Sequence, residues 1–400
     1  MKPLRYPFGT ITITEKTKKL VNDALNSGRI SGGKYVREFE KEFAKLVGAR
    51  EAVAVSSGTD ADALAMAVLY DFGAQRNDEI IVPALSFVAT GNSVYQAGFV
   101  PKFVDIERHT LNIDPKKIEA AITPKTRAIM PVHLMGKPAD MDPIKTVAKK
   151  HNLYIIEDAA EAQSAIYKGK NIGTIGDMAA FSLYIAHVIS TGEGGIVTTD
   201  NPEYAELLRS LRAHGRACKC EHCVLNTDSG YCEKRFKYST DIRFIFERIG
   251  FSAKMNELEA AIGLGYLDIY PEIFKKRQEN FTYIRREFKK FDSYLMTIDP
   301  APHEEMAPYA FPVILKEKLP FTKDELVSYL EKNGIDTRSL FLSMPTQCPG
   351  FRHLGHRLGE FPEAEYVSNN GFHIGIHQDI NNEHIDYFIA LVDRFLNDHL

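Results

Sequence analysis

The 400-residue sequence has no apolar run of the roughly 18 residues that a membrane-spanning helix needs, and no strong excess of charge. We therefore expect no membrane partner. Lysine and arginine number 49 and aspartate and glutamate number 53, which leaves a formal net charge of −4. Nucleic-acid binders are usually strongly basic, so we expect no nucleic-acid partner. The N-terminal residues Met1–Pro7 lack the apolar core of a secretory signal, which predicts a cytoplasmic protein.

Cysteine is also scarce, but four of the five cysteines lie close together in the sequence. In a chain without a secretion signal, such a cluster is more typical of a metal site than of disulfides. The spacing is C-x-C-x₂-C-x₈-C, and four thiolates can hold an iron–sulfur cluster or a tetrahedral zinc ion. The spacing alone leaves both metals open, and cysteines without a metal are a third alternative. The predicted ligands are Cys218, Cys220, Cys223 and Cys232, whereas the distant Cys348 is expected to take no part.

Apolar, β-branched runs alternate with segments of helical periodicity through the first half of the chain. Strands that alternate with helices predict an α/β fold with a doubly wound, mostly parallel sheet. We therefore predict a large α/β domain over residues 1–250, which includes a cysteine-rich loop at 216–236. The expected strands cover residues 51–55, 79–82, 100–104, 128–132 and 153–156.

The pattern changes after residue 250. Two long helices are predicted over residues 253–270 and 271–291, and a helix over 383–396 ends the chain. Residues 251–400 are therefore predicted to hold linking helices and a smaller C-terminal α+β domain. In doubly wound sheets ligands bind outside the carboxyl ends of the strands, so the loops there are where we expect a site.

Three of these loops carry residues that suit a cofactor with a phosphate and a ring nitrogen. The segment 57–59 (Ser-Gly-Thr) lies between a strand and a helix, where backbone N–H groups can bind a phosphate or the serine can simply cap the helix. Asp158 ends a buried strand, where it can pair with a protonated ring nitrogen or cap the next helix. The third segment, 182–195, contains a histidine and ends in a glycine-rich turn.

In this order and combination, the loops resemble the nucleotide-sugar branch of the fold type I pyridoxal-phosphate enzymes. This branch is the DegT/DnrJ/EryC1/StrS family of sugar aminotransferases and related dehydratases, and the resemblance covers nearly the whole chain. It implies the aspartate aminotransferase type I fold and a homodimer with sites at the subunit interface. The stretches that carry the resemblance are residues 57–59, 83–90, 157–160, 191–195, 212–215 and 255–263.

The resemblance also implies roles for residues around a pyridoxal or pyridoxamine 5'-phosphate. Backbone and hydroxyl groups would hold the phosphate, an aromatic ring would stack on the pyridine, and a carboxylate would keep its nitrogen protonated. Gln163 is expected to contact the ring hydroxyl. Ser252 stands where the family often has an asparagine that reaches a phosphate across the dimer interface. The other implied residues are Gly58, Thr59 and Ser182 for the phosphate, Phe87 for stacking and Asp158 for the ring nitrogen.

Position 187 departs from the aminotransferases of this family. Those enzymes have a lysine before the Thr-Gly-Glu-Gly-Gly turn, whereas this chain has His187 and no lysine from Asn171 to Cys218. Imidazole cannot form a stable Schiff base, so the cofactor is expected as pyridoxamine phosphate. Histidine can still move protons near pH 7, because its ordinary pKa is about 6.5. His187 is therefore predicted to act as the base in an elimination reaction.

A histidine at this position and a cysteine loop after residues 212–215 are similar to the CDP-6-deoxy-hexulose 3-dehydrase group, which uses pyridoxamine phosphate and an iron–sulfur cluster. The resemblance implies a 3-dehydratase of a nucleotide-linked 4-keto-6-deoxyhexose, with a ferredoxin- or flavin-type reductase as partner. That group has one cluster ligand well upstream, but this chain has no cysteine before Cys218. Cys223 would have to replace it, so [2Fe-2S] and [4Fe-4S] clusters both stay open.

Three other functions stay open at this point. A dehydratase could regenerate its cofactor amine from glutamate and use the cysteines for a structural zinc. A non-catalytic paralogue could serve as a partner or scaffold, with His187 as an ordinary core or surface residue. An ordinary aminotransferase is disfavoured by the missing lysine.

Overall fold

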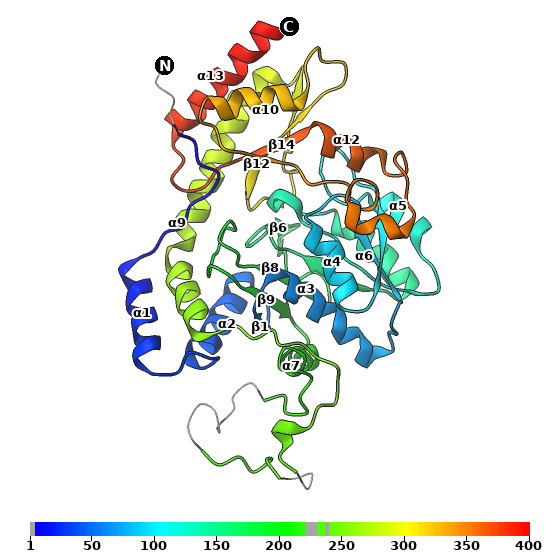
Figure 1. Ribbon diagram of the computed structural model, residues 1–400, viewed down its shortest axis with the longest axis vertical. Coiled ribbons are helices and arrows are strands. Elements are labelled where there is room, and N and C mark those ends of the chain that lie inside the picture. The colour runs from blue at the N-terminus through cyan, green and yellow to red at the C-terminus, as the bar shows by residue number, and fades with distance from the viewer. Residues whose placement is uncertain (1–4, 221–223, 225–229, 237–239) are drawn as a thin grey trace.

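The computed structural model of the protein describes residues 5–220, 224, 230–236 and 240–400 (Figure 1). Within these residues, seven strands form a central sheet in the order β1-β9-β8-β5-β4-β2-β3. Neighbouring strands run parallel from β3 to β8, whereas β9 is antiparallel to both of its neighbours. This arrangement confirms the predicted α/β class with a mostly parallel sheet. The strands are β1 (Glu51–Val55), β2 (Glu79–Pro83), β3 (Val100–Val104), β4 (Thr126–Ile129), β5 (Tyr154–Asp158), β8 (Met178–Ser182) and β9 (Gly195–Thr199).

Helices cover both faces of this sheet, so its strands are apolar on both sides. Side chains alternate between the faces of a strand. In β1, accordingly, Val53 and Val55 join one buried apolar cluster, while Ala52 and Ala54 join the other. The first cluster takes in α3 (Gly58–Ala67), α4 (Val88–Gln96) and α7 (Pro202–Leu211). The second takes in α2 (Lys34–Val47), α5 (Pro115–Ala121), α6 (Met141–His151) and the first half of α9 (Glu257–Phe288).

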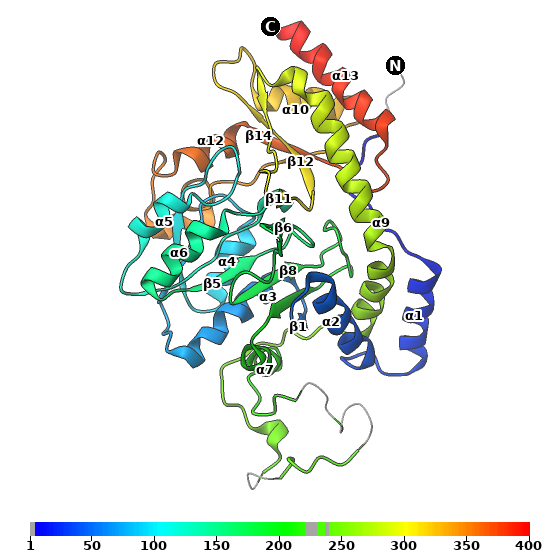
Figure 2. The ribbon, with the colours of Figure 1, turned by 180° about the vertical axis from the view of Figure 1, so that it is seen from behind.

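The long helix α9 runs from the large sheet to the C-terminal part of the chain (Figure 2). The sequence predicts two helices here, but the structure has one. Asn256 caps it and Glu259 completes a capping box, and the helix then continues through Pro271 to Phe288. A proline removes only one donor from the helical hydrogen-bond ladder, and buried side chains on both sides of it keep this helix continuous.

The C-terminal part contains an antiparallel sheet in the order β10-β12-β14-β13, as expected for the smaller α+β domain. The N-terminal arm also packs on this part, because Tyr6 pairs with Ile335 and its hydroxyl donates to the Gly375 carbonyl at 2.8 Å. The predicted boundary near residue 250 stays a prediction. The elements here are β10 (Leu295–Met296), β12 (Ala310–Leu315), β13 (Thr337–Ser339), β14 (Gly371–Gly375), α10 (Lys323–Lys332), α11 (Met344–Gln347), α12 (Pro362–Asn370) and α13 (Asn382–His399).

Short elements complete the described chain. Helix α1 (Glu15–Asn26) packs along α9, and β6 (Ile166–Tyr167) lies between β7 (Lys170–Asn171) and β11 (Glu304–Glu305) in a small separate sheet. None of the helices in the described ranges is long and apolar enough to span a membrane. The 3₁₀ turns cover Val68–Phe72, Leu134–Gly136, Ile242–Phe244, Lys289–Phe291 and Pro349–Leu354.

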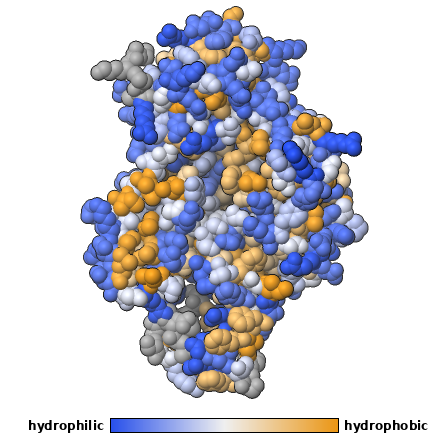
Figure 3. All heavy atoms as spheres, in the orientation of Figure 1, coloured by the Kyte–Doolittle hydropathy of each residue, from blue (hydrophilic) through white to orange (hydrophobic). Residues whose placement is uncertain are grey.

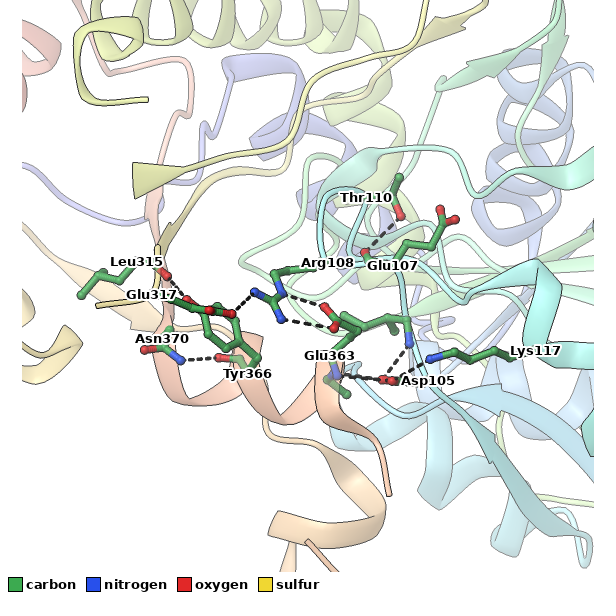
Figure 4. Close-up of polar contacts among 12 residues, drawn as sticks. Asp105, Glu107, Arg108, Thr110, Lys117, Leu315, Glu317, Glu363, Tyr366 and Asn370 are labelled. Carbon is green, nitrogen blue, oxygen red and sulfur yellow. Dashed lines mark hydrogen bonds and ion pairs between the residues drawn. The ribbon is translucent and has the colours of Figure 1, made fainter. Parts of the chain in front are cut away.

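Polar side chains after β3 join the large sheet to helix α12 (Figure 4). Arg108 donates to both carboxylate oxygens of Glu363 at 2.6 and 3.2 Å and to Glu317 at 3.2 Å. The buried Asp105 carboxylate accepts from the backbone N–H of Ala364 at 2.9 Å and of Glu363 at 3.3 Å. The Asp105 carboxylate thus caps the N-terminus of a helix that lies about 260 residues further along the chain, in place of a side chain at the N-cap residue Phe361.

We expect Asp105→Ala to lower the free energy of unfolding by about 2–4 kcal/mol, since it leaves two helix N–H groups without their acceptor. It also leaves the Lys117 ammonium without its partner at 3.0 Å. The midpoint of urea unfolding measures the loss. Asp142→Ala is the matched control, because it also removes an aspartate paired with a lysine but lies at the surface. Equal midpoints for the two variants would contradict the capping role.

Candidate functional site

A cavity of about 540 Å³ lies where the carboxyl ends of the central strands face the C-terminal sheet. We call it the active-site cavity. Six residues singled out from the sequence line it together, although they come from separate loops. They are Gly58, Thr59, Phe87, Asp158, Ser182 and His187.

The phosphate end of the cavity is built where helix α3 begins. The Ser57 hydroxyl accepts from the Asp60 N–H at 3.0 Å and caps the helix. The N–H groups of Gly58 and Thr59, which come before Asp60 in the first turn, have no acceptor within the helix. A Cβ added at Gly58 would lie 2.7 Å from the Ser182 Cβ, and one added at Gly195 would lie 2.1 Å from the Ser57 carbonyl oxygen. The glycines therefore let three turns meet closely, which forms the cradle that a phosphate needs.

The ring end of the cavity is built around Asp158, whose residue is 4% exposed. Thr90 donates to its Oδ2 at 2.8 Å and the Ala160 N–H donates to its Oδ1 at 3.2 Å. Burial raises the pKa of this carboxyl, and the two donors oppose the rise by stabilising the charged form. The ring of Phe87 is 58% exposed at the start of α4, so it presents a free apolar face to the same cavity. A pyridine ring stacked on Phe87 would lie beside the Asp158 carboxylate, which its two hydrogen bonds hold in place.

A second carboxyl at this end, Asp62, was not predicted. It is 4% exposed on α3, lines the cavity, and its Oδ1 has no hydrogen-bond partner among the described residues. Burial and the charge of Asp158 raise its pKa well above the ordinary range. The available signal was a second acid in an alanine-rich helix, two residues beyond Asp60 of the first turn, because such a helix is otherwise expected to bury that face.

His187 lies in the loop between β8 and β9 and lines the cavity. Its Nδ1 is buried and has no partner within the part of the chain that the structure describes. The Tyr309 ring lies 5.4 Å away, centroid to centroid. Burial, and then the positive charge of Arg277, lower the pKa of His187 to about 4. The imidazole is therefore neutral at pH 7 and able to accept a proton.

Two predicted residues do not line the cavity. Gln163 is fully buried behind it and donates to the carbonyls of Ala160 at 3.1 Å and Ser182 at 3.0 Å. Glu161, two residues earlier in the sequence, lines the cavity. Its carboxylate accepts from the Met135 N–H at 2.6 Å, and burial raises its pKa to about 8. The predicted contact of Gln163 with the ring hydroxyl stays a prediction.

Ser252 also lies away from the cavity. It is exposed and forms an isolated backbone bridge with Ala213, at the base of the segment between α7 and α9. Its predicted contact with a phosphate requires a second subunit, so it stays a prediction. Figure 1 shows this segment extending away from the central sheet.

Three of the four predicted metal ligands lie in the described part of this segment, and Cys223 lies outside the described residues. Burial, followed by the neighbouring thiols of Cys218 and Cys232, raises the pKa of Cys220, while Lys234 opposes the rise. In the ranges that the structure describes, no three histidine, cysteine or acidic side chains are arranged to hold a metal ion.

The wall opposite the cofactor end comes from the N-terminal arm and the C-terminal sheet. It was not predicted from the sequence. Its main residues are Phe8, Tyr309, Arg338, Phe341 and His373.

A helix end that suits a phosphate, a buried carboxylate beside it and an open aromatic face define a fold type I pyridoxal-phosphate enzyme. The chain belongs to the DegT/DnrJ/EryC1/StrS aminotransferase family, whose model matches residues 11–393. This confirms the resemblance seen in the motifs.

Named relatives include both dehydratases and a synthase. The chain is 35% identical to dTDP-4-dehydro-2,6-dideoxy-D-glucose 3-dehydratase of Saccharopolyspora spinosa, over 98% of this chain and 87% of the relative. It is 35% identical to GDP-perosamine synthase of Caulobacter vibrioides, over 92% of this chain and 91% of the relative. A crystal structure of GDP-4-keto-6-deoxymannose-3-dehydratase with a trapped PLP-glutamate geminal diamine matches with a TM-score of 0.84 at 30% identity, over 96% of this chain and 99% of that one.

Proposed function

We propose that the protein is a pyridoxamine-phosphate-dependent 3-dehydratase of a nucleotide-linked 4-keto-6-deoxyhexose. The observation that carries the proposal is the identity of the residue at the cavity position where an aminotransferase would need its cofactor-binding lysine. His187 is there, and none of the lining residues in the described part of the chain is a lysine. A neutral imidazole can take up and return a proton without capturing the cofactor covalently.

The cavity residues fit the cofactor. When bound, pyridoxamine phosphate supplies an amine for the substrate ketone and a conjugated ring that accepts electrons. Gly58, Thr59 and Ser182 would hold the phosphate at the start of α3, and Phe87 would cover one face of the ring. Asp158 would keep a proton on the ring nitrogen, because its negative charge favours the protonated form. His187 accepts a proton at one of its ring nitrogens and returns it later in the reaction.

Replacing a C–OH by C–H while the ketone is kept requires two electrons from a reductant and two protons from solvent, and it releases one water molecule. We propose that Cys218, Cys220, Cys223 and Cys232 hold an iron–sulfur cluster that passes these electrons singly from a ferredoxin- or flavin-type reductase. The spacing C-x-C-x₂-C-x₈-C of these four cysteines supports a shared ligand set. The basic Lys234 beside them favours thiolates and offsets an anionic cluster.

We also propose a homodimer. The segment between α7 and α9 carries apolar side chains that are exposed in the single chain. Hydrophobic and hydrophilic residues are mixed on the surface at this end of the molecule (Figure 3). Large apolar side chains on one surface usually mark an interface. The exposed ones on this segment are Tyr231, Phe236, Phe244, Phe246 and Ile249.

A second candidate is a dehydratase that takes its reducing equivalents from glutamate. The relative with a trapped PLP-glutamate adduct favours it. Oxidation of glutamate to 2-oxoglutarate supplies the two electrons and no cluster is then needed. The cysteines would bind a structural zinc.

Anaerobic purification, followed by iron and sulfide analysis and a visible spectrum, tests the proposal. We expect iron and sulfide, and dehydration of a 4-keto-6-deoxy sugar nucleotide that depends on an added reductase but not on glutamate. Cys218→Ser and Cys232→Ser should lose the iron, whereas Cys348→Ser should keep it. A colourless, iron-free protein that turns over with glutamate alone would establish the second candidate instead. Failure to bind pyridoxamine phosphate would point to a non-catalytic paralogue.

A further inference from the structure

Arg338 and His373 lie directly opposite each other on the antiparallel strands β13 and β14. Directly opposed residues on such a pair place their side chains on the same face of the sheet, within contact distance. Both side chains line the active-site cavity. The cofactor end, with Asp158 and the start of α3, forms the other wall. The pair therefore faces the space above a bound cofactor.

His373 is 3% exposed, and its Nδ1 has no hydrogen-bond partner among the residues described. Aromatic rings surround it, with Phe8 at 5.2 Å, Phe341 at 6.2 Å and Tyr309 at 6.4 Å between centroids. Burial and the positive charge of Arg338 lower its pKa to about 3, so the imidazole is neutral. A buried polar atom without a partner costs free energy, which a ligand that pairs with it restores.

Arg338 is half-exposed and lies over the Phe8 ring, with the guanidinium carbon 5.1 Å from the ring centroid. One of its terminal nitrogens donates to the Asp336 carboxylate and to the Thr337 carbonyl, both at 3.3 Å. Among the described residues, this leaves the other nitrogens of the planar fork available to a ligand. Such a fork matches two oxygens of a phosphate or carboxylate. Of the residues described at the cavity, Arg338 is the one that carries a permanent positive charge.

The acidic side chains of the cavity belong to the opposite wall and to the loop before β9. They would repel a second anion there, so Arg338 offers the favourable position for one. The acids are Asp62, Asp158, Glu161 and Glu193.

We propose that Arg338 and His373 form an anion-binding subsite that holds a phosphate or carboxylate oxygen of the molecule that reacts above the cofactor. The guanidinium fork pairs with the anionic oxygens, and the imidazole hydrogen-bonds to an adjacent polar atom. Under the proposed function, on which the identity of the ligand rests, the anion is the diphosphate of the sugar nucleotide or a carboxylate of an amino donor such as glutamate.

Titration calorimetry of the cofactor-loaded protein tests the subsite, with GDP, dTDP and L-glutamate as separate probes. Arg338→Gln removes the charge and Arg338→Lys keeps it without the planar fork. His373→Phe keeps the ring packing and His373→Asn restores a hydrogen-bonding group. The matched control is Arg394→Gln, which removes an arginine that is 75% exposed on α13, away from the cavity.

We expect Arg338→Gln to weaken binding of one probe class by about tenfold or more, the loss typical of a charge-assisted hydrogen bond. Arg338→Lys should recover part of the loss, and His373→Phe should weaken the same probe, with recovery in His373→Asn. A loss confined to the nucleotides assigns the subsite to the diphosphate, and a loss confined to glutamate assigns it to the amino donor.

The subsite is overturned if Arg338→Gln matches Arg394→Gln for all three probes, or if the wild-type protein binds none of them. Failure of the proposed function gives a different result. A protein that binds a probe through Arg338 but does not dehydrate the sugar nucleotide retains the subsite and loses the dehydratase assignment.

Discussion

Dehydration by a His187→Asn variant falls by about 10²- to 10⁴-fold, the range expected when a positioned general base is removed. Asparagine keeps the polarity of the loop and cannot accept the proton. Cofactor binding should change little, because Gly58, Thr59 and Asp158 belong to other loops. Rate measurements at saturating substrate, together with the cofactor dissociation constant, separate the two effects.

The pH dependence of the same reaction gives a second test. The proton-accepting form of His187 is the neutral one, which is populated above its pKa and lost as the pH falls through it. Burial and Arg277 hold that pKa at about 4, so the acid limb of kcat/KM should lie well below the ordinary value of 6.5. The control variant is His353→Asn, which makes the same substitution at an exposed histidine. An acid limb near pH 6.5 would argue against the assigned role. Equal activities of His187→Asn and His353→Asn would also argue against it.

His187→Lys reverses the chemistry at this position. A lysine amine there can bond covalently to the aldehyde form of the cofactor, and borohydride reduction followed by mass spectrometry would detect that bond. We expect dehydration to be suppressed in this variant. The same bond in the wild-type protein, at any other lysine, would restore the ordinary aminotransferase as an explanation.

The predicted residues that reach the cavity share one property. Each lies at or near the carboxyl end of a buried strand of the central sheet: Asp158 and Ser182 end their strands, and Gly58 lies three residues after β1. Strands that run in the same direction bring their carboxyl ends to one edge of the sheet. Local sequence patterns therefore predict their meeting without any knowledge of tertiary contacts. The same reasoning predicts the α/β class and the positions of the strands.

Residues that depend on tertiary packing were not predictable in this way. Arg338 and His373 are separated by more than 30 positions and meet only because β13 pairs with β14. Phe8 reaches them because the N-terminal arm crosses to the C-terminal sheet, where Tyr6 pairs with Ile335. No periodicity or spacing in the sequence expresses such contacts.

Glu161 lines the cavity whereas Gln163 is buried behind it, and this difference has a local cause. After β5 the chain makes two successive tight turns, in which the Ala162 N–H donates to Ala159 and the Ala165 N–H donates to Ala162. Within such turns, two residues of separation are enough to move a side chain from the cavity to the buried side. The sequence shows that the turn exists but does not set which of the two side chains faces the ligand.

Asp158→Asn should lower dehydration by about 10²- to 10³-fold, comparable to the loss of one preorganised electrostatic partner in an active site. The amide has the same shape and can keep the contact with Thr90, but it has no negative charge to hold a proton on the ring nitrogen. The ring then accepts electrons poorly, and the elimination slows although the cofactor stays bound. Turnover rates and the absorption spectrum of the bound cofactor measure the two consequences.

Asp62→Asn is the matched control, since it makes the same substitution at a buried carboxyl that lines the same cavity. Burial and Asp158 raise the pKa of Asp62 well above its ordinary range, so a neutral amide resembles its favoured form. We expect this variant to retain most of its activity. Similar losses in both variants would mean that the two carboxyls act as a pair sharing one proton, and the charge on Asp158 alone would no longer account for the protonated ring.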